Sequence, residues 1–369
     1  MQSLVALPSN LPVPLDDGTC NHLISLHLSD FANAIITWQK QHGRHDLPWQ
    51  NTIDPYAIWV SEIMLQQTQV AAVLGYYAKF MARFPNIHAL AAATQEEVLQ
   101  YWSGLGYYSR ARNLHNAAQR IMDDFGGQGV EAKFPQDFDY ILSLPGIGRS
   151  TAAAISTFAF NLPQPILDGN VKRVFARHFL VEGWPSSPKV EQQLWQIALR
   201  ENPTEGAAAY TQGLMDLGAT LCTRGKPRCS DCPVNMSCQA FAQNLTHTLP
   251  TAKPRKVIPE KSTHMLVMVD GDEVMLEKRP SSGIWGGLWS FPEVDVAPES
   301  AQFLPKLSHT FTHFKLHIQP LLIYKSKHNQ DLKQQTIWLN LEDAIGAAIP
   351  TPVRKILLNL KEKGEFKSI

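Results

Sequence analysis

The chain has 369 residues, of which 44% are hydrophobic and 18% are charged, and its formal net charge at pH 7 is zero. This length allows two domains with cores of their own, and the composition is that of a soluble globular protein. Zero net charge excludes a global basic field, so any nucleic-acid binding must depend on local patches. No apolar run approaches the length of a membrane span, so no membrane partner is expected.

Residues 1–29 are predicted to form a flexible leader, because three prolines precede Asp16 and a following glycine. This stretch lacks a basic segment followed by a continuous apolar run, so we predict no secretory signal and expect a cytoplasmic protein, associated with the nucleoid in a bacterium. Residues 30–242 show helical spacing of apolar residues almost throughout, which predicts a mainly α-helical domain. The expected helices cover residues 32–41, 56–73, 71–84, 95–101, 111–125, 138–143, 149–160, 171–179, 190–201 and 207–218.

The helix expected over 56–73 begins after Asp54 and Pro55, which suit a cap and a first turn. It carries Glu62 and Gln66 four residues apart, so both are expected on one face. A carboxylic acid on a largely apolar helix tends to have a raised pKa, as a general acid near neutral pH requires. Glutamine amides both donate and accept hydrogen bonds, which suits the reading of base edges. A surface glutamate on an amphipathic helix is the alternative interpretation.

The segment from Gly104 to Asn113 contains two glycines followed by two tyrosines and two arginines. The glycines allow a close approach of the backbone, and the ring of Tyr107 could wedge between bases. Arg110 and Arg112 are expected to be available for phosphates. A turn with two half-buried rings would explain the same pattern.

Residues 144–150 read Leu-Pro-Gly-Ile-Gly-Arg-Ser and precede an alanine-rich helix. Such a turn directs backbone N–H groups outward at a helix N-terminus, where they suit a phosphate. Asp168 then precedes Gly169 and Asn170 at the expected N-cap of the next helix. A turn between two helices, followed by a capping aspartate, is the alternative.

Four of the five cysteines lie within seventeen residues, in the spacing C-x6-C-x2-C-x5-C. Disulfides are not expected in a reduced cytosol, so this cluster predicts a metal centre. Structural zinc sites more often use two short knuckles separated by a longer loop, whereas one compact loop suits a cubane 4Fe–4S cluster. The predicted ligands are Cys222, Cys229, Cys232 and Cys238.

Residues 243–262 form a basic, proline-rich stretch that predicts a linker. Residues 263–369 then change to an α+β pattern. Strands are expected over 264–269 and 273–278, joined by a hairpin at Asp270-Gly271-Asp272, with further strands over 315–324 and 336–341 and a closing helix over 353–363.

Taken together, these segments resemble the adenine DNA glycosylases of the helix-hairpin-helix, endonuclease III superfamily, which act on adenine mispaired with oxidised guanine. The resemblance implies a multidomain fold class: a mainly α helix-hairpin-helix glycosylase domain with an iron–sulfur cluster loop, plus a C-terminal α+β Nudix-like domain. The residues that carry it are 47–49, 62, 104–113, 144–152, 166–173, 215–219, the four cysteines and 286–289.

The resemblance also implies a mechanism and a set of catalytic residues. The target adenine would flip into a pocket beside Trp49 and near Gln212. Glu62 would protonate the base, Asp168 would stabilise the oxocarbenium charge that develops at C1′, and Asn170 would orient the groups or the water.

Recognition of DNA is expected from a second set of residues, again by resemblance. The expected partner is double-stranded DNA that contains adenine opposite 8-oxoguanine or guanine. Gln66 and Tyr107 would face the lesion, and the turn with Gly146, Gly148 and Ser150 would grip a phosphate. Relatives present a Phe-Ser-His loop to the oxidised guanine, and this chain has Phe311, Thr312 and His313 there.

Two further expectations concern activities that this chain should lack. The endonuclease III branch has a lysine nucleophile directly after the hairpin turn, where this chain has Ser150. A hydroxyl cannot form the Schiff base that β-elimination needs, so no AP-lyase step is expected. Residues 286–292 match the start of a Nudix box, but its metal-binding set does not follow, so no pyrophosphatase activity is expected. A monomer is the default.

Three other hypotheses stay open at this point. The chain could be an endonuclease III-type glycosylase and lyase that acts on oxidised pyrimidines. It could be a catalytically silent lesion-binding or redox iron–sulfur protein, or a Nudix hydrolase with a helical accessory domain. Ser150 argues against the first of these hypotheses. The presence of Glu62 together with Asp168 argues against a silent protein, and the incomplete Nudix box argues against a Nudix hydrolase.

Overall fold

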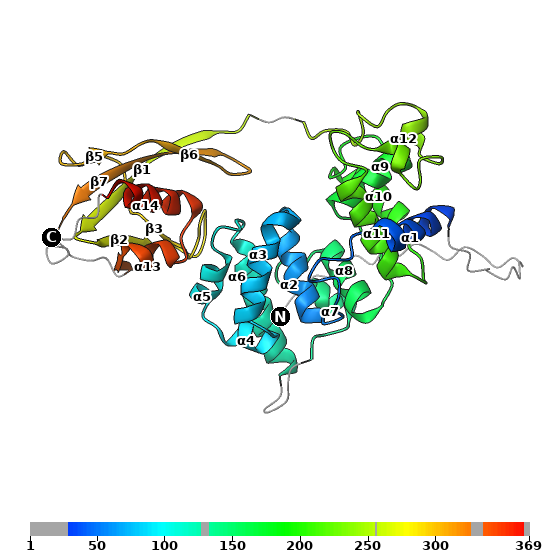
Figure 1. The fold of residues 1–369 in the computed structure, drawn as a ribbon, viewed down its shortest axis with the longest axis horizontal. Helices are drawn as coiled ribbons and strands as arrows, with labels where there is room; N and C mark the ends of the chain where they lie inside the picture. Colours follow the sequence, from blue (N-terminus) through cyan, green and yellow to red (C-terminus); the bar gives the residue numbers. More distant parts are fainter. Residues whose placement is uncertain (1–28, 127–132, 255–256, 326–334, 365–369) are drawn as a thin grey trace, which may run out of the picture.

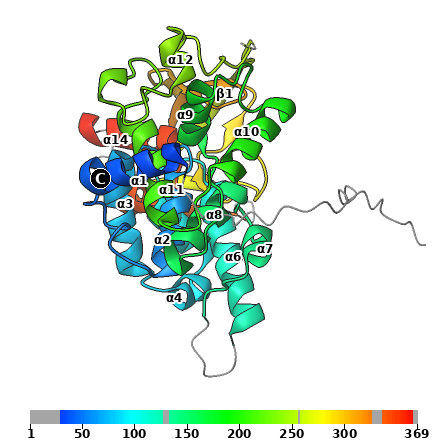
Figure 2. The ribbon, with the colours of Figure 1, turned by 90° about the vertical axis from the view of Figure 1, so that its right-hand side faces the viewer.

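The computed structural model describes residues 29–126, 133–254, 257–325 and 335–364, so residues 1–28 of the expected leader and residues 255–256 of the expected linker lie outside the description. A helical part and a sheet-containing part lie toward opposite ends of the molecule, joined by an extended connection after α12 (Figure 1). Figure 2 shows the two parts one behind the other, so the molecule is elongated along the horizontal axis of Figure 1.

The helical part contains twelve described α-helices and a short 3-10 turn. Each helix that was expected from residue 95 onward is present in this part, which confirms a mainly helical domain. The bounds are α1 (Asp30–His42), α2 (Pro55–Leu65), α3 (Val70–Arg83), α4 (Ile87–Ala92), α5 (Gln95–Trp102), α6 (Ser109–Phe125), α7 (Phe138–Ser143), α8 (Arg149–Phe160), α9 (Gly169–His178), α10 (Pro188–Arg200), α11 (Ala207–Thr220), η1 (Cys229–Asp231) and α12 (Gln239–Ala242).

Local capping explains where several of these helices begin. The Asp54 carboxylate accepts a hydrogen bond from the N–H of Tyr56, and Pro55 is the first residue of α2. Asp168 caps α9 in the same way by accepting from the N–H of Val171. A capping side chain satisfies a backbone donor that has no partner within its own helix. Both caps were predicted from the sequence and are confirmed.

The single helix expected over 56–73 is wrong. The chain leaves the helical conformation after Leu65 and re-enters it at Val70, and Gln67 between them has a φ of 57°. Gln66 is consequently the C-cap of α2 rather than part of a continuous face with Glu62. The break has a long-range cause, described next, which the residues of the segment itself do not show.

The Arg110 guanidinium holds the end of α2. Its NH1 atom donates to the carbonyl oxygens of Ile63, Met64 and Gln66 at 3.0, 2.7 and 2.5 Å. Its NH2 atom donates to the carbonyl of Gly106 at 3.1 Å, so the same cation also holds the turn before α6. Carbonyls at a helix C-terminus have no partner within the helix, and a cation there is favoured by the helix dipole.

The expectation that Arg110 and Arg112 would be free for phosphates is therefore wrong. Arg110 is only 7% exposed. The NH1 atom of Arg112 donates to the Gly286 carbonyl at 2.8 Å, in the sheet-containing part of the chain. Both cations support the architecture instead.

The C-terminal part is an α+β domain, as expected, and its described residues form an eight-stranded sheet that includes the four predicted strands. The central strands are ordered β3-β2-β1-β7-β5, with β1 and β7 parallel. The hairpin between β1 and β2 turns at Gly271, whose φ is 60°. The strands are β1 (Glu260–Asp270), β2 (Glu273–Lys278), β3 (Trp289–Ser290), β4 (Glu293–Val294), β5 (Gln302–Phe303), β6 (Leu307–Thr310), β7 (Lys315–Tyr324) and β8 (Thr336–Asn340).

Helices α13 (Leu341–Gly346) and α14 (Thr351–Lys363) cover one face of this sheet (Figure 1). The buried face of α14 includes Val353, Leu357 and Leu360, which belong to one apolar cluster with Val267 of β1 and Leu276 of β2. Burial of such side chains stabilises the domain by about 1.5–3 kcal/mol for each large apolar residue.

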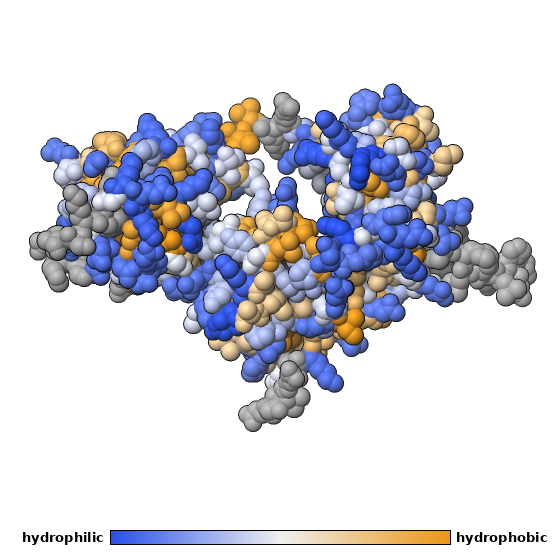
Figure 3. Space-filling view, viewed as in Figure 1, coloured by the Kyte–Doolittle hydropathy of each residue, from blue (hydrophilic) through white to orange (hydrophobic). Residues whose placement is uncertain are grey.

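The two parts of the chain contact each other directly. The Ser103 hydroxyl, after α5, donates to the Ile349 carbonyl at 2.9 Å and accepts from Arg354 of α14 at 2.9 Å. Lys278 of β2 forms an ion pair with Glu96 of α5 at 2.6 Å. A hollow separates the C-terminal domain from the lobe that carries α9, α10 and α12 (Figure 3). Among the described residues, no helix is both long enough and apolar enough to cross a bilayer.

We expect Arg110→Met to lower the free energy of unfolding by about 3 kcal/mol, because several acceptors at the end of α2 and at Gly106 lose their donor together. Urea denaturation followed by circular dichroism measures the loss. Arg112→Met is the matched control, with an expected loss of about 1 kcal/mol for its hydrogen bond to Gly286. Equal losses in the two variants would contradict the role given to Arg110.

Candidate active site and nucleic-acid interface

Five residues predicted from the sequence line one groove in the helical domain. The groove has a volume of about 750 Å³. Next to it lies a pocket of about 330 Å³, which is lined by Trp49, Gln212 and Glu62. The two cavities share five lining residues, Glu62 among them, so the carboxyl group of Glu62 lies where the groove meets the pocket. The five predicted residues in the groove are Glu62, Gln66, Ser150, Asp168 and Asn170.

Asp168 lies at the start of α9, where its carboxylate meets several hydrogen-bond donors. One oxygen accepts from the N–H of Val171 at 2.7 Å, and the other accepts from the Asn170 amide at 3.2 Å. Burial raises the pKa of Asp168, whereas these donors and the nearby Arg173 act to lower it. The helix N-terminus also favours a negative charge. Asp168 is thus equipped to carry charge despite its burial.

Glu62 lies inside α2, where the backbone N–H groups are used by the helix itself. Its carboxyl group has no hydrogen bond to any of the described residues. Burial raises the pKa of Glu62 to about 8, and the neighbouring Asp168 carboxylate adds to this shift. At neutral pH Glu62 therefore holds a proton, while Asp168 has the donors that stabilise an anion. The two carboxyl groups that face this groove therefore differ in their surroundings, because Asp168 accepts from several donors and Glu62 accepts from none in the described part of the chain.

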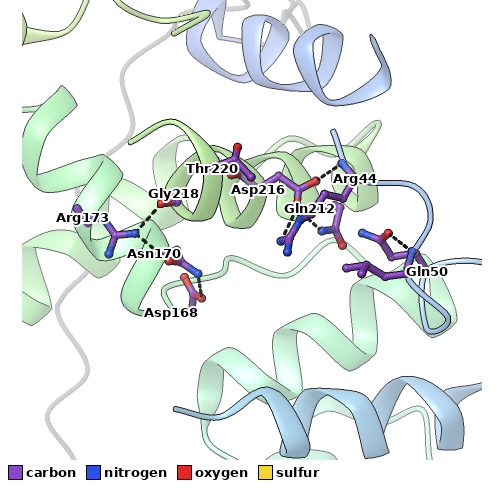
Figure 4. Close-up of polar contacts among 10 residues, drawn as sticks. Arg44, Gln50, Asp168, Asn170, Arg173, Gln212, Asp216, Gly218 and Thr220 are labelled. Atoms are coloured by element: carbon purple, nitrogen blue, oxygen red, sulfur yellow. Dashed lines mark hydrogen bonds and ion pairs between the residues drawn. The ribbon is translucent and has the colours of Figure 1, made fainter. Parts of the chain in front are cut away.

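The side chain of Asn170 is fixed between Asp168 and Arg173 (Figure 4). Its amide nitrogen donates to Asp168, and its amide oxygen accepts from Arg173 NH2 at 2.9 Å. Arg173 is held in turn by the carbonyls of Gly218 and Cys222, each at 2.7 Å. The carboxylate of Asp168 is consequently oriented by a chain of hydrogen bonds that reaches the cysteine loop.

The turn before α8 is packed against the end of α2. Gln66 donates to the Gly146 carbonyl at 3.3 Å and to the Thr151 hydroxyl at 3.2 Å. Gly146 has a φ of 81°, and a Cβ there would lie 2.8 Å from the Cβ of Asn113, so this position needs glycine. Gly148 is the N-cap of α8, and no side chain caps the helix there. The first N–H groups of α8 thus stay available to an anion.

Four of the five residues expected to face the lesion line a separate cavity of about 670 Å³ between the two domains, whereas Gln66 lines the groove instead. Tyr107 enters it from the helical domain, and Phe311, Thr312 and His313 enter from the loop between β6 and β7. Tyr107 is 45% exposed and has a φ of 50°, a conformation that is strained for an aromatic residue. The Phe311 ring is stacked on Phe314 at 4.7 Å, while Thr312 and His313 are exposed.

The four cysteines predicted as metal ligands line a single cavity beside α9 and α11. They are free thiols and half-buried. No group of three or more histidine, cysteine or acidic side chains in the described part of the chain is arranged to hold one metal ion. Thiols that surround a cavity, rather than converging on one point, fit a cluster of several metal ions better than a single ion. The sulfur donors thus fit an iron–sulfur cluster.

Both parts of the chain match models of known protein families. A model of the HhH-GPD superfamily base excision DNA repair proteins matches residues 60–199, and a NUDIX domain model matches residues 264–359. The adenine DNA glycosylase of Buchnera aphidicola subsp. Acyrthosiphon pisum is 37% identical over 347 residues, which cover 90% of this chain and 98% of the relative. The chain belongs to the adenine DNA glycosylase family.

Other relatives agree with this assignment. The adenine DNA glycosylase of Homo sapiens is 32% identical, over 88% of this chain and 73% of the human protein. A solved thermostable thymine-DNA glycosylase is 29% identical, with a TM-score of 0.52, and the match covers 58% of this chain and 95% of that structure. The resemblance and the fold class inferred from the sequence are confirmed. As an adenine DNA glycosylase, the chain is a DNA N-glycosylase that acts on adenine in base-excision repair, with DNA as its partner.

Two residues of the site, Arg44 and Gln50, were not predicted from the sequence, and Asp216 was included in residues 215–219 without a role. Arg44 lines both the groove and the pocket, and its Nε atom donates to the Asp216 carboxylate at 2.7 Å. Asp216 is fully buried behind the pocket and also accepts from the Gln212 amide at 2.8 Å (Figure 4). Gln50 lines the pocket as well. Arg44 and Gln50 flank the Leu-Pro-Trp motif, and this proximity could have drawn attention to them.

The raised pKa of Glu62 predicts how adenine release depends on pH. Protonated Glu62 is present below about pH 8 and is lost above it. We therefore expect the single-turnover rate to fall about tenfold for each pH unit above that value. Rates measured between pH 6 and about pH 10 test this, with binding to uncleavable mispaired DNA as the control for DNA affinity. A flat profile across this range would contradict the assignment of Glu62 as the acid.

Proposed function

We propose that this protein hydrolytically removes adenine that is paired with 8-oxoguanine, or with guanine, and leaves an abasic site in duplex DNA. The observation that carries the proposal is the carboxyl pair of Glu62 and Asp168, whose environments favour opposite protonation states at one groove. Membership of the adenine DNA glycosylase family supports the choice of base.

The proposed reaction begins when the target nucleotide leaves the base stack and its base enters the pocket beside Trp49. Glu62 donates its proton to N7 of the adenine. The bond between C1′ and N9 then breaks, and its electron pair leaves with the base. The Asp168 carboxylate stabilises the positive charge that develops at C1′. Water forms the new bond to C1′ and loses its proton to the Glu62 carboxylate, which restores the acid, while Asn170 orients the Asp168 carboxylate.

The absence of a lyase step is part of the proposal. β-Elimination needs an amine that can attack C1′ and form a Schiff base. Ser150 lines the groove at the position where the endonuclease III branch has its lysine nucleophile. No lysine is found among the described residues that line this groove. The nearby Lys172 is engaged with Glu191 at 2.6 Å. These features support release of the base by water alone.

Recognition of the opposite base is assigned to the cavity between the domains. Tyr107 supports this because an exposed ring in a strained turn can stack on or between bases. Phe311, Thr312 and His313 line the same cavity and offer a ring, a hydroxyl and an imidazole to a modified guanine. Gln66, which donates to the Gly146 carbonyl, would face the lesion from the groove. The turn with Gly146, Gly148 and Ser150 would bind a phosphate of the DNA backbone through N–H groups at the start of α8.

We also propose that Cys222, Cys229, Cys232 and Cys238 hold a 4Fe–4S cluster. When bound, the cluster would cross-link the loop from 222 to 238, a structural contribution. Arg224 in this loop lines the groove, so an ordered loop would supply a cation to a DNA phosphate.

We further propose that the protein acts as a monomer in the cytoplasm, where bacterial DNA is found. We propose that the glycosylase domain covers residues 30–242 and the Nudix-like domain residues 263–369, with a leader at 1–29 and a linker at 243–262.

An end-labelled duplex with adenine opposite 8-oxoguanine tests the reaction. We expect strand breaks only after heating in alkali, because hydrolysis leaves an intact strand with an abasic site. Glu62→Gln should give no breaks and still bind the mispair. Breaks without alkali would show a lyase step, and normal turnover in Glu62→Gln would exclude Glu62 as the acid.

The cavity between the domains predicts how preference for the partner base depends on its loop. We expect Phe311→Ala and His313→Ala to slow adenine release opposite 8-oxoguanine by about tenfold, and to change release opposite guanine much less. Single-turnover rates on the two duplexes give the ratio. His317→Ala is the control, because His317 is bound to Glu260 at 2.7 Å and does not line this cavity. An equal loss on both duplexes would rule out a role in reading the lesion.

A further inference from the structure

The side chain of Arg177 in α9 is buried although it carries a full positive charge. Only 2% of the residue is exposed, and it lines the cavity that the four cysteines surround. In the described part of the chain, its guanidinium forms no ion pair with a carboxylate. Burial of a charge is unfavourable unless an opposite charge lies close to it. The cavity of the cysteines is therefore the place to look for that negative charge.

Two nitrogens of this guanidinium face the first residues of the cysteine loop. NH1 donates to the Cys222 sulfur at 3.3 Å and to the Thr223 carbonyl at 2.8 Å, and NH2 donates to the Arg224 carbonyl at 3.4 Å. The carbonyls orient the guanidinium but carry no net charge. Cysteine binds a metal as the thiolate, which is an anion. The four ligand thiolates would thus supply the charge that Arg177 lacks.

The remaining nitrogen of the guanidinium binds the linker. Its Nε atom donates to the Leu249 carbonyl at 2.8 Å, and this hydrogen bond is buried. Leu249 is only 5% exposed. The N–H of Leu249 donates in turn to the Leu245 carbonyl at 3.1 Å, in the turn that follows α12. One side chain therefore joins the cysteine loop to the start of the connection between the domains.

The other contacts of the linker with the helical domain are more exposed. The N–H of Gly183 donates to the Thr251 hydroxyl at 3.0 Å in an exposed position. The ammonium group of Lys253 lies 5.2 Å from the centre of the Trp184 ring. Such contacts contribute little at exposed positions, where water competes for the same groups. The bond from Arg177 is consequently the main anchor of this stretch.

We propose that Arg177 is a positioning residue through which the iron–sulfur cluster anchors the start of the linker. The thiolates of the bound cluster balance the charge of Arg177, so its guanidinium stays buried between Cys222 and Leu249. Loss of the cluster leaves this cation without an opposite charge, so it turns toward water and releases Leu249. The connection to the C-terminal domain then starts from a mobile segment. This inference rests on the cluster proposed above and extends its effect from the loop to the linker.

Amide hydrogen exchange of the full chain tests the anchor, because the N–H groups of Leu245, Thr248 and Leu249 are all hydrogen-bonded. The iron-loaded protein is compared with protein whose cluster has been removed by oxidation and chelation. Removal should speed exchange over residues 245–249 by about tenfold, because the released segment opens more often. Exchange over α6, which lies in a different apolar cluster from α9, should stay unchanged. Equal acceleration in both segments would contradict a local anchor.

Variants of Arg177 in the iron-loaded protein separate its charge from a merely structural role. Arg177→Met should speed exchange over residues 245–249 as cluster removal does. It should also lower the reduction potential of the cluster in voltammetry, because the reduced cluster carries more negative charge and has lost a nearby cation. Arg177→Lys keeps the charge and loses the planar fork, so it should restore the potential without restoring slow exchange.

Thr251→Val is the matched control in the linker. It removes the hydrogen bond from Gly183 and leaves Arg177 untouched, so neither the potential nor exchange over residues 245–249 should change. Wild-type exchange and potential in iron-loaded Arg177→Met would overturn this inference alone. If that variant does not take up iron, the loaded and cluster-free wild type decide, and equal exchange over residues 245–249 would overturn the anchor. Purified wild type without iron would overturn the proposed cluster, and this inference with it.

Discussion

The buried Arg110 guanidinium is the interaction on which the arrangement of the whole site depends. It ends α2 one turn after Glu62 and binds the Gly106 carbonyl directly before Tyr107. Its guanidinium also lies 5.3 Å from the centre of the Tyr107 ring. One cation thus joins the helix that carries the acid to the residue that enters the cavity between the domains. The positions of both are set by rigid elements rather than by long loops, which favours a precise site.

The contact between the domains extends this frame to the C-terminal sheet. Ser103 follows α5 and is bound by both Ile349 and Arg354, while Arg112 of α6 reaches Gly286. These bonds surround the cavity that contains Tyr107 and the loop between β6 and β7. The Nudix-like fold therefore contributes a wall of a shared cavity and does not need a catalytic site of its own. The extended connection after α12 does not have to define the geometry, because the interface does so.

The sequence predicted those parts of the structure that depend on local chemistry. Caps at Asp54 and Asp168 are recognisable because the capping residue and its partner are two or three positions apart. The break after Leu65 was missed because its cause, Arg110, is more than forty positions away, and the segment alone keeps a helical pattern. The pair of Arg44 and Asp216 is separated by 172 positions, so only the folded chain brings it together. The residues that perform the chemistry of a site can be predicted from the sequence. The distant residues that fix their positions, such as Arg110 and Asp216, become evident only in the folded chain.

A common physical rule links the carboxyl pair to the Gln212 amide of the pocket. Burial alone raises the pKa of both Glu62 and Asp168, so it cannot distinguish an acid from an anion. The distinction comes from position: the start of α9 offers unused donors to Asp168, and the interior of α2 offers none to Glu62. In the same way, the Gln212 amide carries both a donor and an acceptor until the Asp216 carboxylate occupies its N–H group. The chemistry of each functional group is therefore decided by the neighbour that uses its other hydrogen-bonding capacity.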